Sequence, residues 1–457
     1  MKDIVFSSTL QLAAALRAGR VSAREALDAH LAQIERHNPV LNAVITLDAE
    51  RAQNRAREAD AALARGEIWG PLHGVPFTLK DAHATAGVRT TTGSPELADQ
   101  VPQEDGTVAS RLKAAGGILV GKTNVPSMLA DFQSSNPIFG RTNNPWNVLR
   151  TPGGSSGGAA AALAAGMTPF EVGTDLSGSL RLPAHFCGLF GLKPTEHRVS
   201  LVGLIPGLPG PRSVRIMSCI GPLARTVEDL ALLYPILAGP DGRDTDVPPV
   251  PVDEVPRLAL SDLRIAFSPT FPGFPVAADV REAVERLARQ LQPLCAAVAE
   301  ATLPGLDFQR DLSDAGALIG MAIGAFQPEK SGKPATLAQY LEALDRRDRS
   351  ILAWEELFQS WDVLLCPPSM VTAFPHCEAG TPLCVDGQDV EYGKVSAHCA
   401  LFNYSGHPGV VLPYGLDREG LPVGVQLVGK RWGESRLLAI AQAVSEVSGE
   451  FRRPPGY

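Results

Sequence analysis

Cysteine is scarce in this chain, and no two cysteines have C-x-x-C spacing. The 457 residues contain an odd number of cysteines, namely Cys187, Cys219, Cys295, Cys366, Cys377, Cys384 and Cys399. Such a set does not suit a disulfide framework and favours reduced thiols in a cytoplasmic protein. The stretch "PHCEAGTPLC" (375–384) offers His376, Cys377 and Cys384 as metal ligands, but its spacing matches no standard zinc pattern.

The chain also lacks long apolar runs and clusters of basic charge. No window is long and apolar enough to span a membrane, and the N-terminal stretch lacks the apolar core of a signal peptide. The net charge is −8, with Lys and Arg scattered, whereas a nucleic-acid surface needs clustered basic residues. We therefore expect neither a membrane nor a nucleic acid as a partner.

The composition is that of an ordinary globular protein, with 45% hydrophobic and 20% charged residues. Predicted helices and strands alternate throughout. Ser22 and Glu25 have the spacing of a capping box at the start of a helix at 22–38. Further helices are predicted at 48–67, 106–117, 276–294, within 335–360 and at 434–448, with strands at 42–47, 74–81, 118–123, 362–367 and 409–415. This alternation predicts an α/β fold in which helices cover both faces of a central sheet.

Residues 116–123, "GGILVGKT", match the letters of a P-loop. A P-loop needs its strand before the first glycine and its helix at the lysine. Here the apolar run 118–120 lies inside the supposed loop, and "NVP" follows the threonine, which discourages a helix. We therefore interpret this segment as a strand rather than an ATP site.

The stretch "TPGGSSGG" (151–158) places two serines between glycine pairs, just before an alanine-rich helix. It fits the G-x-S-x-G pattern of a nucleophile elbow, with either Ser155 or Ser156 at the tip. The residues before it do not form a convincing strand, and that interpretation also needs a histidine. His376, His398 and His407 have no distinctive setting. An α/β-hydrolase-type esterase stays an alternative.

A second serine cluster and a lysine complete the candidate site. Ser179 follows a predicted strand and precedes a predicted helix, where backbone N–H groups stabilise an oxyanion. The plain alternative for Ser179 is a helix N-cap. Lys80 ends a buried strand beside Asp81, where a weak surface ion pair is the common role. As a base, Lys80 must be neutral and therefore desolvated.

Together, "GVPFTLKD" (74–81), "TPGGSSGG" (151–158) and "GTDLSGSLRLPAHFCGLFGLKPT" (173–195) resemble the lysine, cis-serine and nucleophile segments of the amidase signature family. The two serine positions are 179 − 155 = 24 residues apart, similar to the spacing in that family. Flanking matches extend the resemblance over nearly the whole chain. The resemblance implies one amidase signature domain over 1–457 with a central mixed sheet, core motifs at about 70–200, and a variable region and helical cover at 239–360.

The resemblance also implies a mechanism without metal or cofactor. Lys80 accepts a proton from Ser155, Ser155 accepts one from Ser179, and Ser179 attacks an amide carbonyl. The peptide bond before Ser155 is expected to be cis. Backbone N–H groups at Leu176, Ser177 and Gly178, together with that of Ser179, form the expected oxyanion hole.

Three further residues have supporting roles in this interpretation. Ser156 is expected to help hold Lys80. Asp175 and Arg181 resemble the supporting polar pair of the family, with a purely structural ion pair as the alternative. Ser177 and His197 stand where the family commonly has glycine, so these two residues bear on substrate preference. The alternative for His197 is a surface side chain without a role in the site.

The expected activity is that of a monomeric or homodimeric stand-alone amidase acting on small-molecule amides. Met128, Leu129, Phe132 and Phe139 would suit aryl or small apolar groups, or would simply pack in the core. Carbamates (urethanes) and esters are further candidate substrates. The runner-up is an amidotransferase A-type subunit that releases ammonia from glutamine within a complex, although residues 205–222 depart from the pattern expected of such subunits.

Overall fold

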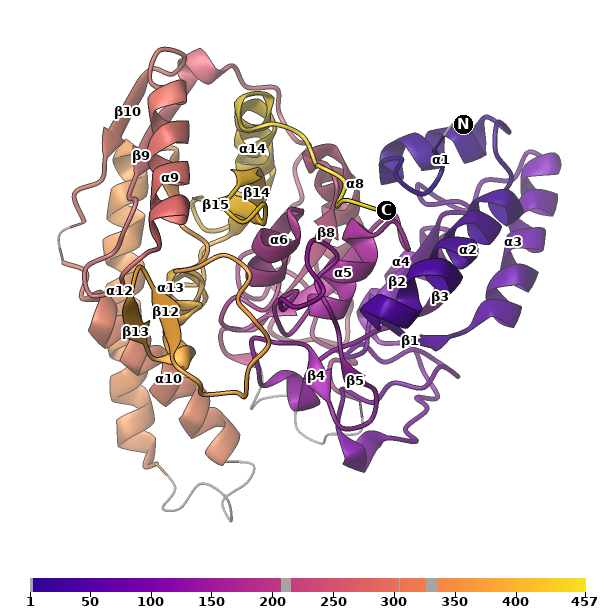
Figure 1. Ribbon diagram of the computed structural model, residues 1–457, viewed down its shortest axis with the longest axis horizontal. Coiled ribbons are helices and arrows are strands. Elements are labelled where there is room, and N and C mark those ends of the chain that lie inside the picture. Colours follow the sequence, from indigo (N-terminus) through magenta and orange to yellow (C-terminus); the bar gives the residue numbers. More distant parts are fainter. Residues whose placement is uncertain (1–2, 207–214, 304, 326–334) are drawn as a thin grey trace.

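The structure is a computed structural model that describes residues 3–206, 215–303, 305–325 and 335–457. Figure 1 shows N-terminal helices at one side of the molecule and the helices and strands of the C-terminal half at the other. Residues 207–214 of the 205–222 segment lie outside the described residues, so the departure of that segment from the amidotransferase pattern is not assessed as a whole.

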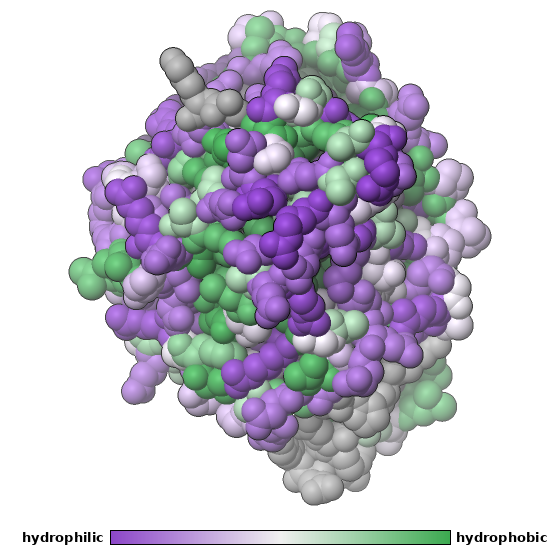
Figure 2. All heavy atoms as spheres, turned by 90° about the vertical axis from the view of Figure 1, so that its right-hand side faces the viewer, coloured by the Kyte–Doolittle hydropathy of each residue, from purple (hydrophilic) through white to green (hydrophobic). Residues whose placement is uncertain are grey.

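The N-terminal part packs helices around a small sheet of three strands. The strands are β1 (Val44–Leu47), β3 (Ile118–Thr123) and β2 (Pro76–Lys80), with β2 and β3 parallel. The helices are α1 (Thr9–Arg17), α2 (Ala23–Leu41), α3 (Ala49–Ala64) and α4 (Thr107–Ala114). Figure 2 shows this side of the molecule, where hydrophilic side chains predominate and smaller hydrophobic groups lie between them.

An eight-stranded mixed sheet forms the centre of the fold. Its order is β10 (Ala297–Glu300), β9 (Arg264–Phe267), β11 (Val363–Cys366), β15 (Pro422–Val428), β14 (Gly409–Leu416), β7 (Phe190–Lys193), β8 (Cys219–Ala224) and β6 (Glu171–Asp175). The pairs β10–β9 and β9–β11 are parallel and the others antiparallel. The predicted central mixed sheet is therefore confirmed.

Helices cover both faces of this sheet, as expected from the alternation of the sequence. The helices α8 (Val227–Leu237), α9 (Ala278–Leu291) and α14 (Glu434–Ser448) pack on one face. The other face carries α5 (Gly157–Ala164), α6 (Arg181–Cys187) and α13 (Ala397–Tyr404), with α10 (Phe308–Gly324) and α12 (Leu337–Ser360) outside them. Alternate residues of β11 face the two cores, as the period of a strand requires.

Short elements complete the chain. They are the strand pairs β4 (Ser135–Asn136) with β5 (Gly140–Arg141) and β12 (Leu383–Val385) with β13 (Gln388–Val390), and the 3₁₀ helices η1 (Pro95–Leu97), η2 (Ser127–Leu129), η3 (Leu260–Asp262) and η4 (Tyr392–Lys394).

The predicted elements agree with the structure within a few residues. Both hydrogen bonds of the capping box between Ser22 and Glu25 are present at the start of α2. The stretch that matches a P-loop contains β3, which confirms its interpretation as a strand. The helix α10 was not predicted.

Candidate active site

Lys80 is fully buried at the end of β2 and faces three hydroxyl groups. Its Nζ lies 2.8 Å from Ser155 Oγ, 2.8 Å from Ser156 Oγ and 2.7 Å from Thr174 Oγ1. A neutral amine has two hydrogens and one lone pair, so it can donate to two of these hydroxyls and accept from the third. The alternative of a solvated surface ion pair with Asp81 is wrong, because Lys80 has no exposed surface.

Burial lowers the pKa of Lys80 to about 7, because the charged form is desolvated among neutral hydroxyls. The carboxylates of Asp175 and Glu171 oppose this effect by favouring the charged form. A substantial fraction of Lys80 is therefore neutral near pH 7, as a proton acceptor must be.

Ser155 and Ser156 lie in the glycine-rich loop that leads into α5. The Gly154–Ser155 peptide bond is cis, as the resemblance implies. A Cβ on Gly154 would lie 2.6 Å from the carbonyl oxygen of Asp131, so only glycine fits this close approach. No strand lies in residues 142–156, all of which the structure describes. The loop is therefore not the strand-to-helix turn that a nucleophile elbow needs.

Ser179 lies just before α6 and is 7% exposed. Its carbonyl oxygen accepts the N–H of Ser156 at 3.0 Å, which joins the two serine segments. Its Oγ makes no hydrogen bond to any residue that the structure describes, to Ser155 Oγ included. The side chain does not cap α6, because the N-cap of that helix is Leu180.

A buried ion pair supports the loop before Ser179. Arg181 donates to both oxygens of Asp175 at 3.0 Å each. It also donates to Gln426 Oε1 at 2.8 Å and to Asn403 Oδ1 at 2.5 Å. Burial alone would raise the pKa of Asp175, but the guanidinium of Arg181 holds that pKa well below its ordinary value. Asp175 is thus a fixed negative charge beside the loop.

The same carboxylate orders the expected oxyanion hole. Asp175 Oδ1 accepts the N–H of Gly178 at 2.7 Å, so this N–H is not free for a substrate. Gly178 has φ of 107°, a left-handed conformation that favours glycine. Among the described residues, no acceptor is bonded to the N–H groups of Leu176, Ser177 and Ser179. The hypothesis of an oxyanion hole now rests on these three donors.

A cavity of about 430 Å³ opens over the serines. Ser155, Thr174 and Ser179 form its polar floor, and its wall is mostly apolar. The wall residues include Met128, Leu129, Phe132, Leu204, Ile205, Ile319 and Ile323. Phe139 does not line the cavity; the guanidinium of Arg89 lies 5.1 Å from the centre of its ring.

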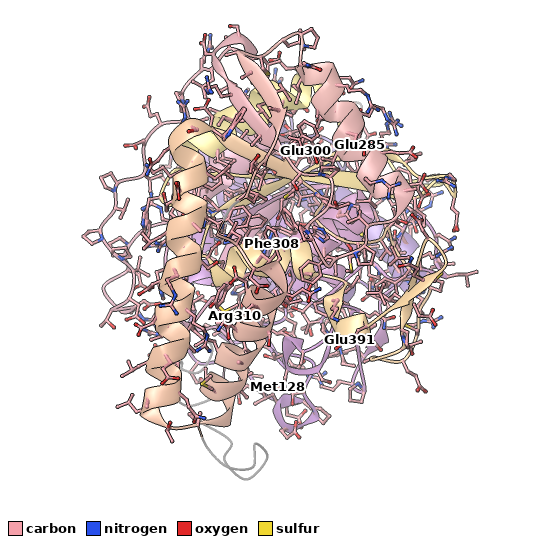
Figure 3. The ribbon with its side chains drawn as sticks, turned by 90° about the vertical axis from the view of Figure 1, so that its left-hand side faces the viewer. Met128, Glu285, Glu300, Phe308, Arg310 and Glu391 are labelled. Carbon is pink, nitrogen blue, oxygen red and sulfur yellow. The ribbon has the colours of Figure 1, made fainter. Side chains whose placement is uncertain are left out.

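A second cavity of about 500 Å³ adjoins the first. Phe132, Ser177 and Ile319 line both cavities, so the side chain of Ser177 lies where they meet. In Figure 3, Met128 lies near the C-terminal part of α10 and Glu391 lies across from the same helix. The second cavity includes Glu391 in its lining, whereas Met128 belongs to the first.

Other candidates from the sequence lie apart from this cavity. His197 is one-third exposed beside Glu196, has a left-handed φ of 64°, and does not line the cavity. In the part of the chain that the structure describes, no group of three or more His, Cys, Asp or Glu side chains is placed to hold a metal ion. No helix in these residues is long and apolar enough to cross a membrane.

Several residues of the site were missed by the sequence analysis. Thr174 contacts Lys80 and directly precedes Asp175, so its place in the motif could have signalled it. Asp131, Tyr392, Ile319 and Ile323 line the cavity from distant parts of the chain. No local pattern marks these four residues.

The family model described as Amidase matches residues 25–327 and 319–438. The chain belongs to the amidase family. It is therefore related to enzymes that act on C–N bonds, and the amidase signature resemblance seen in the sequence is confirmed. A curated relative from Synechococcus sp., the A-type subunit of glutamyl-tRNA(Gln) amidotransferase, is 34% identical over 485 residues, covering 96% of each chain.

Solved structures of amidase signature enzymes share the fold. One solved structure is described as a vestigial protein complex that reveals the evolutionary origins of an s-triazine catabolic enzyme. Its chain is 30% identical in sequence to the present chain, with a TM-score of 0.87. The match covers 98% of this amidase-family chain and 100% of the other. A bacterial aryl acylamidase of the amidase signature family is 26% identical over 99% of each chain, with a TM-score of 0.86.

Proposed function

We propose that this amidase-family protein cleaves amide C–N bonds through an acyl-enzyme on Ser179, with Lys80 and Ser155 as the proton relay. The observation that carries the proposal is the buried Lys80 amine, 2.8 Å from Ser155 Oγ. A lysine that is partly neutral near pH 7 and touches a serine in the cavity floor has the properties of a general base.

The proposed reaction has two balanced halves. Lys80 takes the proton of Ser155, Ser155 takes that of Ser179, and Ser179 Oγ bonds to the carbonyl carbon. The tetrahedral intermediate then collapses, the C–N bond breaks, Ser155 returns a proton to the departing nitrogen, and Lys80 returns its proton to Ser155. In the second half a water molecule gives a proton to Ser155 as Ser155 gives its own to Lys80, and the water oxygen attacks the carbonyl carbon of the acyl-enzyme ester. The bond to Ser179 Oγ then breaks, Ser155 gives a proton to Ser179, Lys80 returns its proton to Ser155, and the acid is released.

The oxyanion of the intermediate is proposed to accept hydrogen bonds from the N–H groups of Leu176, Ser177 and Ser179. The ion pair of Asp175 with Arg181 is proposed to hold the loop, because Asp175 bonds the N–H of Gly178 between these donors. Ser156 and Thr174 fill the remaining hydrogen-bonding positions around Lys80 Nζ.

The apolar wall supports substrates with aryl or small apolar groups, since burial of such groups contributes about 25 cal/mol per Å². Carbamates and esters are included in the proposal, because the same acyl chemistry applies to them. The hydroxyl of Ser177, between the two cavities, is positioned to influence which of these substrates fits.

A second candidate is an amidotransferase A-type subunit that releases ammonia from glutamine within a complex. The curated relatives favour it over a stand-alone amidase, since they are A-type amidotransferase subunits with 34–35% identity. The aryl acylamidase fold supports the stand-alone reaction instead. Both candidates use the same acyl-enzyme on Ser179 and differ in the substrate and in the need for partner subunits.

The test uses the purified chain alone with a chromogenic anilide, aliphatic amides and glutamine. Ser179→Ala is expected to abolish hydrolysis, whereas Ser218→Ala, which alters another serine of the cavity wall, is expected to retain the Ser179-dependent reaction. Unchanged turnover in Ser179→Ala would refute the mechanism. If glutamine is the only amide that is hydrolysed, and only after partner subunits are added, the result would favour the amidotransferase candidate.

A further inference from the structure

Asp131 lies in the wall of the cavity, on the segment that follows η2. Its Oδ1 accepts hydrogen bonds from the Tyr392 hydroxyl at 2.5 Å and from the N–H of Phe132 at 2.8 Å. Both donors are neutral. Within the described ranges no Lys, Arg or His side chain forms an ion pair with Asp131, and no donor is bonded to its Oδ2.

A chain of hydrogen bonds holds this carboxylate in place. The Tyr392 hydroxyl, which donates to Asp131, accepts from Gln133 Nε2 at 3.1 Å. Gln133 is itself fixed to the backbone of Cys377, donating to its carbonyl oxygen at 2.8 Å and accepting its N–H at 3.2 Å. Tyr392 is 6% exposed and Gln133 5%, so the support is buried. The carboxylate is therefore preorganised for a ligand.

The surroundings of Asp131 strengthen its attraction for a cation. Met128, Leu129 and Ile319 line the same cavity, and a charge among apolar groups is less screened than one in water. A primary ammonium matches the free oxygen, since it brings a positive charge and three N–H donors. A neutral apolar group at this position would leave Asp131 Oδ2 without a partner when water is displaced.

We propose that Asp131 binds an ammonium group of the substrate, so that the preferred amides carry a primary amine in addition to the reacting carboxamide. This inference rests on the proposed function of Ser179 and names a substrate class for that site. The ammonium can be the α-amino group of an amino-acid amide such as glutamine, or an amine at the end of an alkyl chain.

The first experiment compares matched amides by the rate of ammonia release. Hexanamide and 5-aminopentanamide have the same number of heavy atoms and differ in a terminal methyl or ammonium group. Glutamine and glutaramate differ in the α-ammonium group. In at least one pair, kcat/KM is expected to be about tenfold to a hundredfold higher for the ammonium compound, as for hydrogen bonds to charged groups. The pair that shows the preference identifies the source of the ammonium.

The variant Asp131→Asn keeps the shape of the side chain and removes its charge. We expect it to reduce that preference to within about threefold of unity. The matched control is Glu391→Gln, which removes a carboxylate that is 71% exposed and lines the second cavity. A preference that survives Asp131→Asn, that is equally lost in Glu391→Gln, or that is absent from both pairs would overturn the proposal.

A binding measurement separates this inference from the chemistry. In Ser179→Ala protein, calorimetry is expected to show that the ammonium compound binds at least about tenfold more tightly than its partner, and that Asp131→Asn removes the difference. If wild-type protein hydrolyses no amide but this difference is found, the proposed function fails and the inference on Asp131 stands. Equal binding of both compounds in both pairs would refute the inference alone.

Discussion

The acid limb of the pH profile reports on Lys80. With a pKa of about 7, Lys80 is mostly protonated below pH 7 and cannot accept the proton of Ser155. At pH 5, two units below this pKa, only about 1% of the base is neutral. We therefore expect kcat/KM to fall about tenfold per pH unit below 7 and to level off above it.

The assay is kcat/KM between pH 5 and pH 9 with an uncharged amide, so that the substrate does not titrate. Glu171→Gln is the matched perturbation, because the Glu171 carboxylate raises the pKa of Lys80. Glutamine retains an oxygen that can accept from Thr78 and Thr123. Burial raises the pKa of Glu171 itself to about 7, so its charge is only partly present on the acid limb, and the variant is expected to move that limb to lower pH by a small amount. A rate that is constant down to pH 5, or a limb centred near 10, would refute a desolvated lysine base.

Two further predictions concern stability. Arg181→Met leaves Asp175 buried without its counter-charge and is expected to lower the free energy of unfolding by about 3–5 kcal/mol, measured by urea denaturation; a loss below 1 kcal/mol would contradict this role. Gly158→Ala would make a Cβ overlap the backbone of Asn124 at the start of α5, with an expected loss of about 1–3 kcal/mol. For that variant, a thermal unfolding midpoint equal to wild type would show that the packing adjusts without cost.

The sequence predicted the motif strands and the serine loops well, because each of these segments is marked by a pattern of residues that are close together along the chain. Residues 74–81 and 171–175 contain β2 and β6, and Lys80 and Thr174 meet where these strands end. The capping box of α2 needs only residues three apart. Local patterns of this kind are the most readable signals in a sequence.

The walls of the cavity could not be predicted, because they depend on long-range packing. Tyr392 reaches Asp131 from 261 residues away, and no spacing rule links them. Strand order also depends on tertiary contacts. In the sheet β15 lies between β11 and β14, although in sequence β15 follows both of them and residues 367–408 separate β11 from β14. The hydrogen bond from Gly178 to Asp175, which removes one expected oxyanion donor, depends on the conformation of that loop.

The most direct test of the central claim is to identify the serine that reacts. The protein would be treated with a serine-reactive fluorophosphonate, and the modified peptide mapped by mass spectrometry. We predict that the labelled residue is Ser179, and that Ser179→Ala protein carries no label on residues 151–181, the stretch that contains Ser155, Ser156 and Ser179. Label on Ser155 or Ser156 instead would contradict the account, because it would make the glycine-rich loop the nucleophile.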